Sequence, residues 1–297
     1  MARSIVFVPG KSLKPLPEVH REYLWRALVR GVSRYDAAAA DALAGDCRFL
    51  LAAWSFAYYG KHGSLDSDIP WIERLMDSEG PSEPDVAEAR HWSKWLTRSL
   101  YALGDHVHWL IDRLPDPRVK EMIRDTLRYF GNVHGIADRV RGIVKAEIEK
   151  ARAGSDSVCL IGHSMGSVIA YEALWELTHR DDRPARIELF LTLGSPLGMK
   201  YVQHKLLGVR DRSHRYPAGI GKWVNVSAVG DLVSVDERVG DDFAPMVTEG
   251  HAGEIVDLHQ DIYTAFRNER GLNPHRSYGY LVHPKVGEVI AKWARNE

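Results

Sequence analysis

Cysteines and long apolar runs are both scarce in this sequence. Only Cys47 and Cys159 are cysteines among 297 residues, too few for the disulfide framework of a small secreted domain. Both lie in apolar segments, so we expect two buried, reduced thiols. No segment approaches the roughly 20 apolar residues of a membrane span, and the apolar run at residues 5–8 is too short for the core of a secretory signal. We therefore expect a cytoplasmic protein with no integral membrane segment.

Net charge is also nearly absent. The 39 Lys and Arg residues almost balance the 40 Asp and Glu residues, which gives a formal net charge of -1. Such a balance offers no general attraction to nucleic acid or to an anionic surface. The sequence lacks the H-E-x-x-H and paired-cysteine patterns of zinc sites and the G-x-G-x-x-G pattern of dinucleotide sites. We expect no nucleic-acid partner, no metal and no cofactor, and the oligomeric state stays open.

Short apolar segments alternate with helical patterns along most of the chain. The apolar segments are continuous rather than alternating, which favours a parallel sheet buried on both faces. We therefore predict an α/β fold, a single domain over residues 1–297 with a mainly parallel central sheet flanked by helices. Strands are expected at residues 4–8, 47–54, 158–161, 187–193 and 223–229, with a weak sixth at 254–257. Helices are expected at residues 18–32, 136–151, 165–177 and 285–295.

The block at residues 57–133 differs because it carries no strand signal. Turn-rich segments are followed by amphipathic helical patterns at residues 86–111 and 118–129. We predict a helical cap inserted into the domain over one end of the sheet. Its tryptophans either pack the cap onto the core or line an apolar inner face suited to an acyl or lipid-like substrate. These tryptophans are Trp71, Trp92, Trp95 and Trp109.

The most distinctive segment is "VCLIGHSMGSVIAYEAL", residues 158–174. Gly162, Ser164 and Gly166 have the G-x-S-x-G spacing of a nucleophile elbow, between an apolar strand and a helical pattern. Glycines two positions on either side of the serine let the turn close, and the helix N-terminus supplies free N–H groups. The alternative interpretation is a glycine-rich turn whose serine caps the helix.

This segment resembles the elbow of α/β-hydrolase-fold serine esterases and lipases. Further segments resemble other blocks of that family: "IVFVPGK" its oxyanion loop, "FLTLGSPLG" a later strand, "WVNVSAVGDLVS" the acid-bearing strand and "NPHRSYGYL" the histidine loop. The blocks occur in the family's order of nucleophile, acid and histidine, and they cover most of the chain outside the predicted cap. The resemblance implies the α/β-hydrolase fold and a Ser-His-Asp triad.

The acid and the base of such a triad are expected in loops that follow strands. Asp231 comes directly after the predicted strand at residues 223–229 and is our predicted acid, with Asp257 as the alternative. His275 lies in a polar turn before the last helix and is our predicted base, supported by its match to the histidine loop. His259 is its competitor among the 14 histidines.

Two backbone N–H groups are expected to hold the oxyanion that develops during acyl transfer. One belongs to Met165, the residue after the nucleophile. By the match of Pro9-Gly10-Lys11 to the family's oxyanion loop, the second belongs to Lys11. Proline replaces the histidine that many relatives carry there.

The sequence thus predicts a serine hydrolase that cleaves carboxylic esters of small molecules, including lipid-like acyl esters, through an acyl-enzyme intermediate. A thioesterase, an amidase or an acyltransferase would use the same residues. A non-catalytic member of the fold that binds lipid or protein is a further alternative. The sequence leaves open the acyl length, the leaving group and whether the cap moves.

Overall fold

A single six-stranded parallel sheet forms the centre of the molecule, in the order β2-β1-β3-β4-β5-β6. The computed structural model describes residues 2–100, 126–231, 233–234 and 238–297, without the side chains of residues 92–100. The sheet confirms the predicted α/β class. Its strands are β1 (Arg3–Val8), β2 (Cys47–Leu51), β3 (Ser157–His163), β4 (Ile187–Leu193), β5 (Ile220–Val226) and β6 (Ala252–Leu258).

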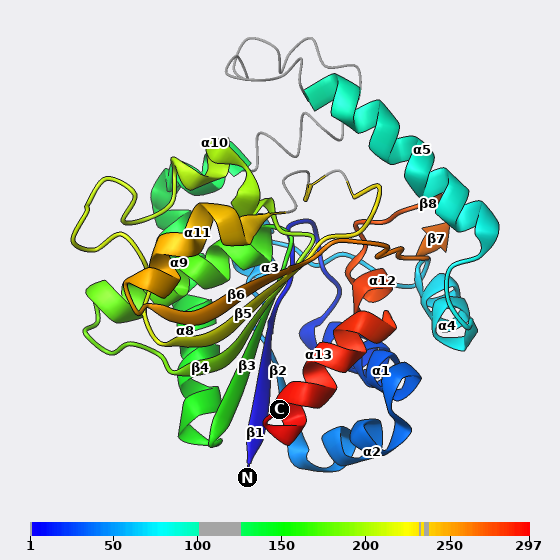
Figure 1. The fold of residues 1–297 in the computed structure, drawn as a ribbon, viewed down its shortest axis with the longest axis horizontal. Coiled ribbons are helices and arrows are strands. Elements are labelled where there is room, and N and C mark those ends of the chain that lie inside the picture. The colour runs from blue at the N-terminus through cyan, green and yellow to red at the C-terminus, as the bar shows by residue number, and fades with distance from the viewer. Residues whose placement is uncertain (1, 101–125, 232, 235–237) are drawn as a thin grey trace.

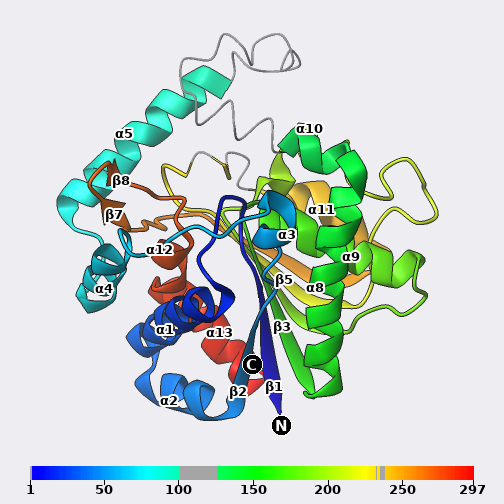
Figure 2. The ribbon, with the colours of Figure 1, turned by 180° about the vertical axis from the view of Figure 1, so that it is seen from behind.

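Helices cover both faces of this sheet (Figures 1 and 2). One layer consists of α8 (Ile136–Ala153), α9 (Met165–His179), α10 (Lys200–Gln203) and α11 (Val239–Thr248). The other consists of α1 (Pro17–Tyr35), α2 (Ala37–Asp46), α12 (Ser277–Leu281) and α13 (Pro284–Arg295). Because alternate strand residues face opposite layers, Val6 and Val8 belong to one core while Ile5 and Phe7 belong to the other. This double burial explains why the strands are continuously apolar.

Strand ends differ from the sequence prediction where a loop leaves the sheet. β2 ends at Leu51 rather than at Trp54, because the chain turns there and the Trp54 N–H bonds the Ala52 carbonyl at 2.9 Å. β5 lies three residues earlier than predicted. Beyond its end, the Ser227 N–H bonds the carbonyl of Leu258, the last residue of β6, and the Val229 N–H bonds the Ile262 carbonyl past that strand.

The two cysteines are free, and Cys159 is buried as predicted. The prediction was wrong for Cys47, which is partly exposed. This residue begins β2, the edge strand, so one flank lacks a neighbouring strand that would cover it.

Residues between β2 and α8 form α3 (Ser55–Tyr59), α4 (Ile69–Asp77) and α5 (Glu83–Leu100), with helical residues 126–130 and the short η2 (Val133–Gly135) on the return. Within the described part of residues 57–133 no strand occurs. Residues 101–125, Trp109 included, and the side chains of Trp92 and Trp95 lie outside the described part. The cap as a unit therefore remains a prediction.

The first turns of α5 lie against the hairpin formed by β7 (Arg267–Asn268) and β8 (Gly271–Leu272), as Figure 1 shows. Arg267 pairs with Asp85 at 2.8 Å and with Glu88 at 2.5 Å. Across the described ranges, no helix has the length and apolar character needed to cross a membrane.

Two glycines allow α1 to pack at very short distance against the end of α12 and against α13. A Cβ added to Gly31 would lie 2.0 Å from the Leu281 carbonyl oxygen, and one added to Gly287 would lie 2.0 Å from the Gly31 carbonyl oxygen. Gly31→Ala is expected to lower the free energy of unfolding by roughly 1–3 kcal/mol, because the overpacked helices must move apart. Urea denaturation measures this change.

The matched control is Gly142→Ala, in the exposed part of α8, where an added Cβ meets nothing within 4 Å. This control should raise the free energy of unfolding by roughly 0.5–1 kcal/mol, because alanine loses less chain entropy on helix formation. Equal effects of both substitutions would contradict the packing argument.

Candidate active site

Three side chains from distant segments form a continuous hydrogen-bonded chain at the carboxyl edge of the sheet. Ser164 stands between β3 and α9, Asp231 follows β5, and His275 lies in the loop before α12. His275 Nε2 lies 2.8 Å from Ser164 Oγ, and His275 Nδ1 lies 2.9 Å from each carboxylate oxygen of Asp231. This edge is where loops of a parallel sheet converge and bind ligands.

Ser164 occupies a strained turn. Its φ of 54° and ψ of -131° are costly for a residue with a Cβ, and α9 begins at the next residue. Added Cβ atoms would lie 2.5 Å from the Ser167 Cα at Gly162 and 2.2 Å from the Val8 carbonyl oxygen at Gly166. Both positions therefore require glycine for the strand and the helix to meet around the serine.

The carboxyl group of Asp231 is fully buried and ionised. Burial favours its neutral form, but the imidazole of His275 and the hydrogen bonds from His275, Tyr280 and the Val233 N–H outweigh burial. Together they lower the pKa of Asp231 to about 2. Because a carboxylate only accepts hydrogen bonds, His275 Nδ1 must carry the proton, which leaves Nε2 of the neutral ring as the acceptor for the Ser164 hydroxyl.

Tyr280 and Gly194 complete this arrangement, and the sequence reasoning assigned neither of them a role. The buried Tyr280 hydroxyl donates to Asp231 and accepts the Ala228 N–H at 3.0 Å. Gly194 has a φ of 54°, and a Cβ there would lie 2.6 Å from a carboxylate oxygen of Asp231. Both residues lie in the segments "NPHRSYGYL" and "FLTLGSPLG", yet no local spacing links them to an acid elsewhere in the chain.

His163 holds the main chain of His275, the predicted base, in place. Its Nε2–H donates to the carbonyl of His275 at 2.8 Å, and the two rings lie 4.9 Å apart. Burial, followed by the nearby His275 and Lys14, holds the pKa of His163 well below its ordinary value. The ring is therefore neutral and acts as a fixed spacer.

The loop after β1 passes directly beside Ser164, the predicted nucleophile. A Cβ added to Gly10 would lie 2.8 Å from Ser164 Cβ. Lys11, the next residue, shares a cavity wall with Met165 and donates from its ammonium group to Thr126 Oγ1 at 3.3 Å. Met165 is the first residue of α9, so its N–H has no acceptor within the helix.

That cavity is open to solvent, and its free space of about 190 Å³ includes solvent outside the protein. Four aromatic rings make up most of its lining, those of Trp54, Tyr58, Tyr59 and Tyr129. Several polar tips of these rings are directed to the surrounding protein. Trp54 donates to the Pro9 carbonyl at 2.8 Å, and the Tyr59 hydroxyl accepts the Ser12 N–H at 3.1 Å. The rings therefore offer the cavity largely apolar surface.

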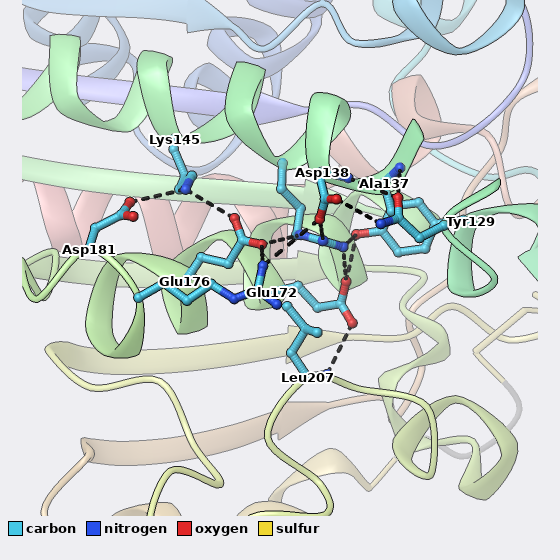
Figure 3. Close-up of polar contacts among 11 residues, drawn as sticks. Tyr129, Ala137, Asp138, Lys145, Glu172, Glu176, Asp181 and Leu207 are labelled. Atoms are coloured by element: carbon cyan, nitrogen blue, oxygen red, sulfur yellow. Dashed lines mark hydrogen bonds and ion pairs between the residues drawn. The ribbon is translucent and has the colours of Figure 1, made fainter. Parts of the chain in front are cut away.

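A buried ionic network fixes one wall of this cavity (Figure 3). The Tyr129 hydroxyl donates to Glu172 at 2.7 Å, and Arg141 donates to Glu172 at 3.1 Å and to Glu176 at 2.8 Å. The Leu207 N–H also bonds Glu172, at 3.1 Å. Both glutamates belong to α9, the helix that starts at the nucleophile turn, so the network ties Tyr129 to that helix.

The alternative residues lie elsewhere. Asp257 accepts the Asn225 side-chain amide at 3.0 Å and the N–H groups of Val239 and Gly240 at 3.1 and 2.8 Å, at the start of α11. The buried Nδ1 of His259 has no hydrogen-bond partner among the residues that the structure describes. The structure therefore brings Ser164 together with Asp231 and His275.

Residues 118–221, about a third of the chain, match the family described as PGAP1-like alpha/beta domain. This family is α/β-hydrolase-like and belongs to the lipase and esterase superfamily. The match includes β3, the Ser164 turn and α9, and it excludes Lys11, Asp231 and His275. No curated protein and no solved structure matches the chain. The sheet and the family match together define an α/β-hydrolase-like fold.

The low pKa of Asp231 predicts a pH-dependent contribution to stability. With a folded pKa of about 2 and an unfolded value near 3.9, the contribution is complete above pH 5 and is lost as the pH falls toward 2. The stability advantage of the wild type over Asp231→Asn should shrink by about 1 kcal/mol between pH 5 and pH 3. Urea unfolding at both pH values measures it, and a constant difference would contradict an ionised native Asp231.

Proposed function

We propose that the protein is a serine hydrolase that cleaves carboxylic esters through an acyl-enzyme intermediate. The observation that carries this proposal is the unbroken hydrogen-bonded chain from Asp231 through His275 to Ser164. Residues 118–221 match a family of the lipase and esterase superfamily, and this match supports an ester as the substrate.

In the proposed mechanism Ser164 Oγ attacks the acyl carbonyl carbon while His275 Nε2 takes its proton. Asp231 keeps the proton on Nδ1 and stabilises the imidazolium that forms. The backbone N–H groups of Met165 and Lys11 donate to the oxyanion. His275 then protonates the leaving alcohol. A water molecule, activated by the same imidazole, releases the acid and restores Ser164.

The aromatic cavity beside Met165 suits the acyl chain of such a substrate, because it borders the position of the reacting carbonyl. We further propose that residues 57–133 act as a cap over this site. Support comes from the packing of α5 on the acid loop, since a Cβ added to Gly230 would lie 2.7 Å from the Ala89 carbonyl oxygen.

Thioesters, amides and acyl transfer to an alcohol would use the same groups and are the runner-up reactions. A role confined to binding lipid or protein is disfavoured by the strain at Ser164. Its φ of 54°, beside a hydrogen-bonded histidine, is the kind of local strain that clusters at active sites.

Labelling with a fluorophosphonate probe tests the nucleophile. The wild type should label, because the probe's phosphorus is attacked by a serine whose proton is taken by histidine. Ser164→Ala should not label. Ser195→Ala changes a buried serine that is not part of the hydrogen-bonded chain from Asp231 to Ser164, and it should still label. If the folded wild-type protein stays unlabelled while a known esterase labels under the same conditions, the proposed enzymatic activity is contradicted.

The two histidine candidates give opposite expectations. His275→Ala should lower kcat for p-nitrophenyl acetate by at least about 10³-fold, as removal of a triad member does. His259→Ala should leave kcat within a factor of about three. The reverse pattern in steady-state assays would reassign the base.

The aromatic cavity predicts a preference for short acyl chains. Activity on p-nitrophenyl esters of graded length should peak at short chains, because the free space there is only about 190 Å³ even with open solvent included. Tyr129→Ala should shift the maximum to longer chains by opening one wall. The matched control, Tyr129→Phe, keeps the ring and should keep the wild-type profile, and a shift in both variants would instead implicate the hydroxyl and its network.

A further inference from the structure

The carbonyl group of Ser164 accepts two hydrogen bonds from a single residue, Ser167, in the first turn of α9. The Ser167 N–H donates to it at 3.0 Å, and the Ser167 hydroxyl donates to it at 2.6 Å. The side chain of Ser167 is fully buried, so water does not compete for this hydroxyl. A side-chain bond to the carbonyl three residues earlier is additional to the backbone bonds with which a helix begins. The mechanism proposed above gives Ser167 no role.

A second buried serine fixes the direction in which the Ser167 hydroxyl donates. Ser195, in the loop after β4, has its Oγ 2.7 Å from Ser167 Oγ, and this Oγ accepts the Leu197 N–H at 3.2 Å. A carbonyl oxygen only accepts, so the one hydroxyl proton of Ser167 lies toward Ser164, and Ser195 must donate to Ser167. Hydrogen bonds in such a series polarise and strengthen one another. The series ends at the Ser164 carbonyl oxygen.

The orientation of this carbonyl determines the orientation of the next N–H group. The Ser164–Met165 peptide is trans and planar, so the Ser164 carbonyl and the Met165 N–H point in opposite directions. Because both bonds from Ser167 hold the carbonyl toward α9, the Met165 N–H points outward from the start of that helix. The torsion that rotates this plane is the ψ of Ser164, which at -131° belongs to a strained backbone conformation. A strained torsion keeps its value only where neighbouring groups hold it.

We propose that Ser167 is a positioning residue, whose hydroxyl fixes the plane of the Ser164–Met165 peptide and so directs the Met165 N–H at the oxyanion. The inference rests on the proposed function, in which Met165 supplies one of the two oxyanion donors. A donor that is already directed at the developing charge needs no reorientation during the reaction, and this is the source of its effect on rate. Ser195 acts one step further away, because it only supports Ser167.

Steady-state kinetics with p-nitrophenyl acetate separate the transition state from substrate binding. Ser167→Ala should lower kcat about tenfold, close to the loss of one hydrogen bond and less than the loss of a whole oxyanion donor. KM should stay within about threefold, because the oxyanion exists only after attack. Ser195→Ala leaves the Ser167 proton on its carbonyl and should lower kcat less than Ser167→Ala does.

The matched control is Thr178→Val, in the same helix about three turns further along. The Thr178 hydroxyl donates to the Leu174 carbonyl at 2.8 Å, so the substitution removes the same kind of bond far from the nucleophile turn. Its kcat should stay within about twofold of the wild-type value. Circular dichroism verifies that each variant is folded. An equal loss of kcat in Thr178→Val and Ser167→Ala would contradict a specific role for Ser167.

Binding of trifluoroacetone measures the tetrahedral state directly. Ser164 Oγ adds to its carbonyl carbon, the hydroxyl proton passes to His275 Nε2, and the carbonyl oxygen becomes the oxyanion. The inhibition constant should rise about tenfold in Ser167→Ala, in parallel with the fall in kcat/KM, because both depend on the oxyanion donors. A general loosening of the turn would instead raise KM as well.

A nuclear magnetic resonance measurement reads the peptide plane without any reaction. Ser164–Met165 is the only Ser-Met pair in the sequence. Protein made by cell-free synthesis with carbon-13 at the serine carbonyl and nitrogen-15 in methionine therefore gives one carbonyl-correlated amide signal, that of Met165. Ser167→Ala should shift this signal and broaden it as the plane is released. Thr178→Val should leave it in place.

Two outcomes would overturn the proposal. One is an active Ser167→Ala protein whose kcat and inhibition constant equal the wild-type values, which leaves the hydrolase proposal intact. The other is an unchanged Met165 signal in Ser167→Ala, whether or not the protein hydrolyses an ester. A wild type that neither hydrolyses nor labels contradicts the proposed function and the catalytic part of this inference with it, while the Met165 signal still decides whether Ser167 fixes the peptide plane.

Discussion

The arrangement at the carboxyl edge of the sheet depends on a single buried carboxylate, that of Asp231. Its charge has no access to water, so it persists only because His275, Tyr280 and a backbone N–H donate to it. His275 and Tyr280 come from one segment, 44 and 49 residues after Asp231, whereas the Val233 N–H belongs to the turn that carries Asp231 itself. Gly194 leaves the space in which they converge. The tautomer of His275, and with it the orientation of the Ser164 hydroxyl, follows from this one charge.

Sequence patterns were sufficient for the features that are local. Buried strands produce continuous apolar runs, and the turn at Ser164 requires its two glycines, so both could be predicted. The terminal positions of β2 and β5 could not, because they depend on where distant loops find hydrogen-bond partners. Tyr280 shows the same limit. Its surroundings arise from long-range packing, and nothing within a few residues of it reveals a buried carboxylate.

Two rigid connections lead away from the nucleophile turn. Through α9, Glu172 and Glu176 join the turn to Arg141 and Tyr129 inside the protein (Figure 3). Through His163, the residue before Ser164 holds the main chain of His275. Burial makes these contacts costly to break singly, since removing one partner would leave a charge or a donor unsatisfied. The main chain around Ser164 is therefore held in part by side chains that have no role in the proposed mechanism.

The contact between Gly230 and the Ala89 carbonyl links the start of α5 to the residue before Asp231. A cap attached in this way, as we propose for residues 57–133, is not an independent module. Replacing α5 with a helix that has bulkier side chains or enters at another angle would displace the loop that carries Asp231. Variation of the insertion during evolution would thus be expected to occur beyond its first turns, leaving residues 83–90 and the loop at 230 to change only together.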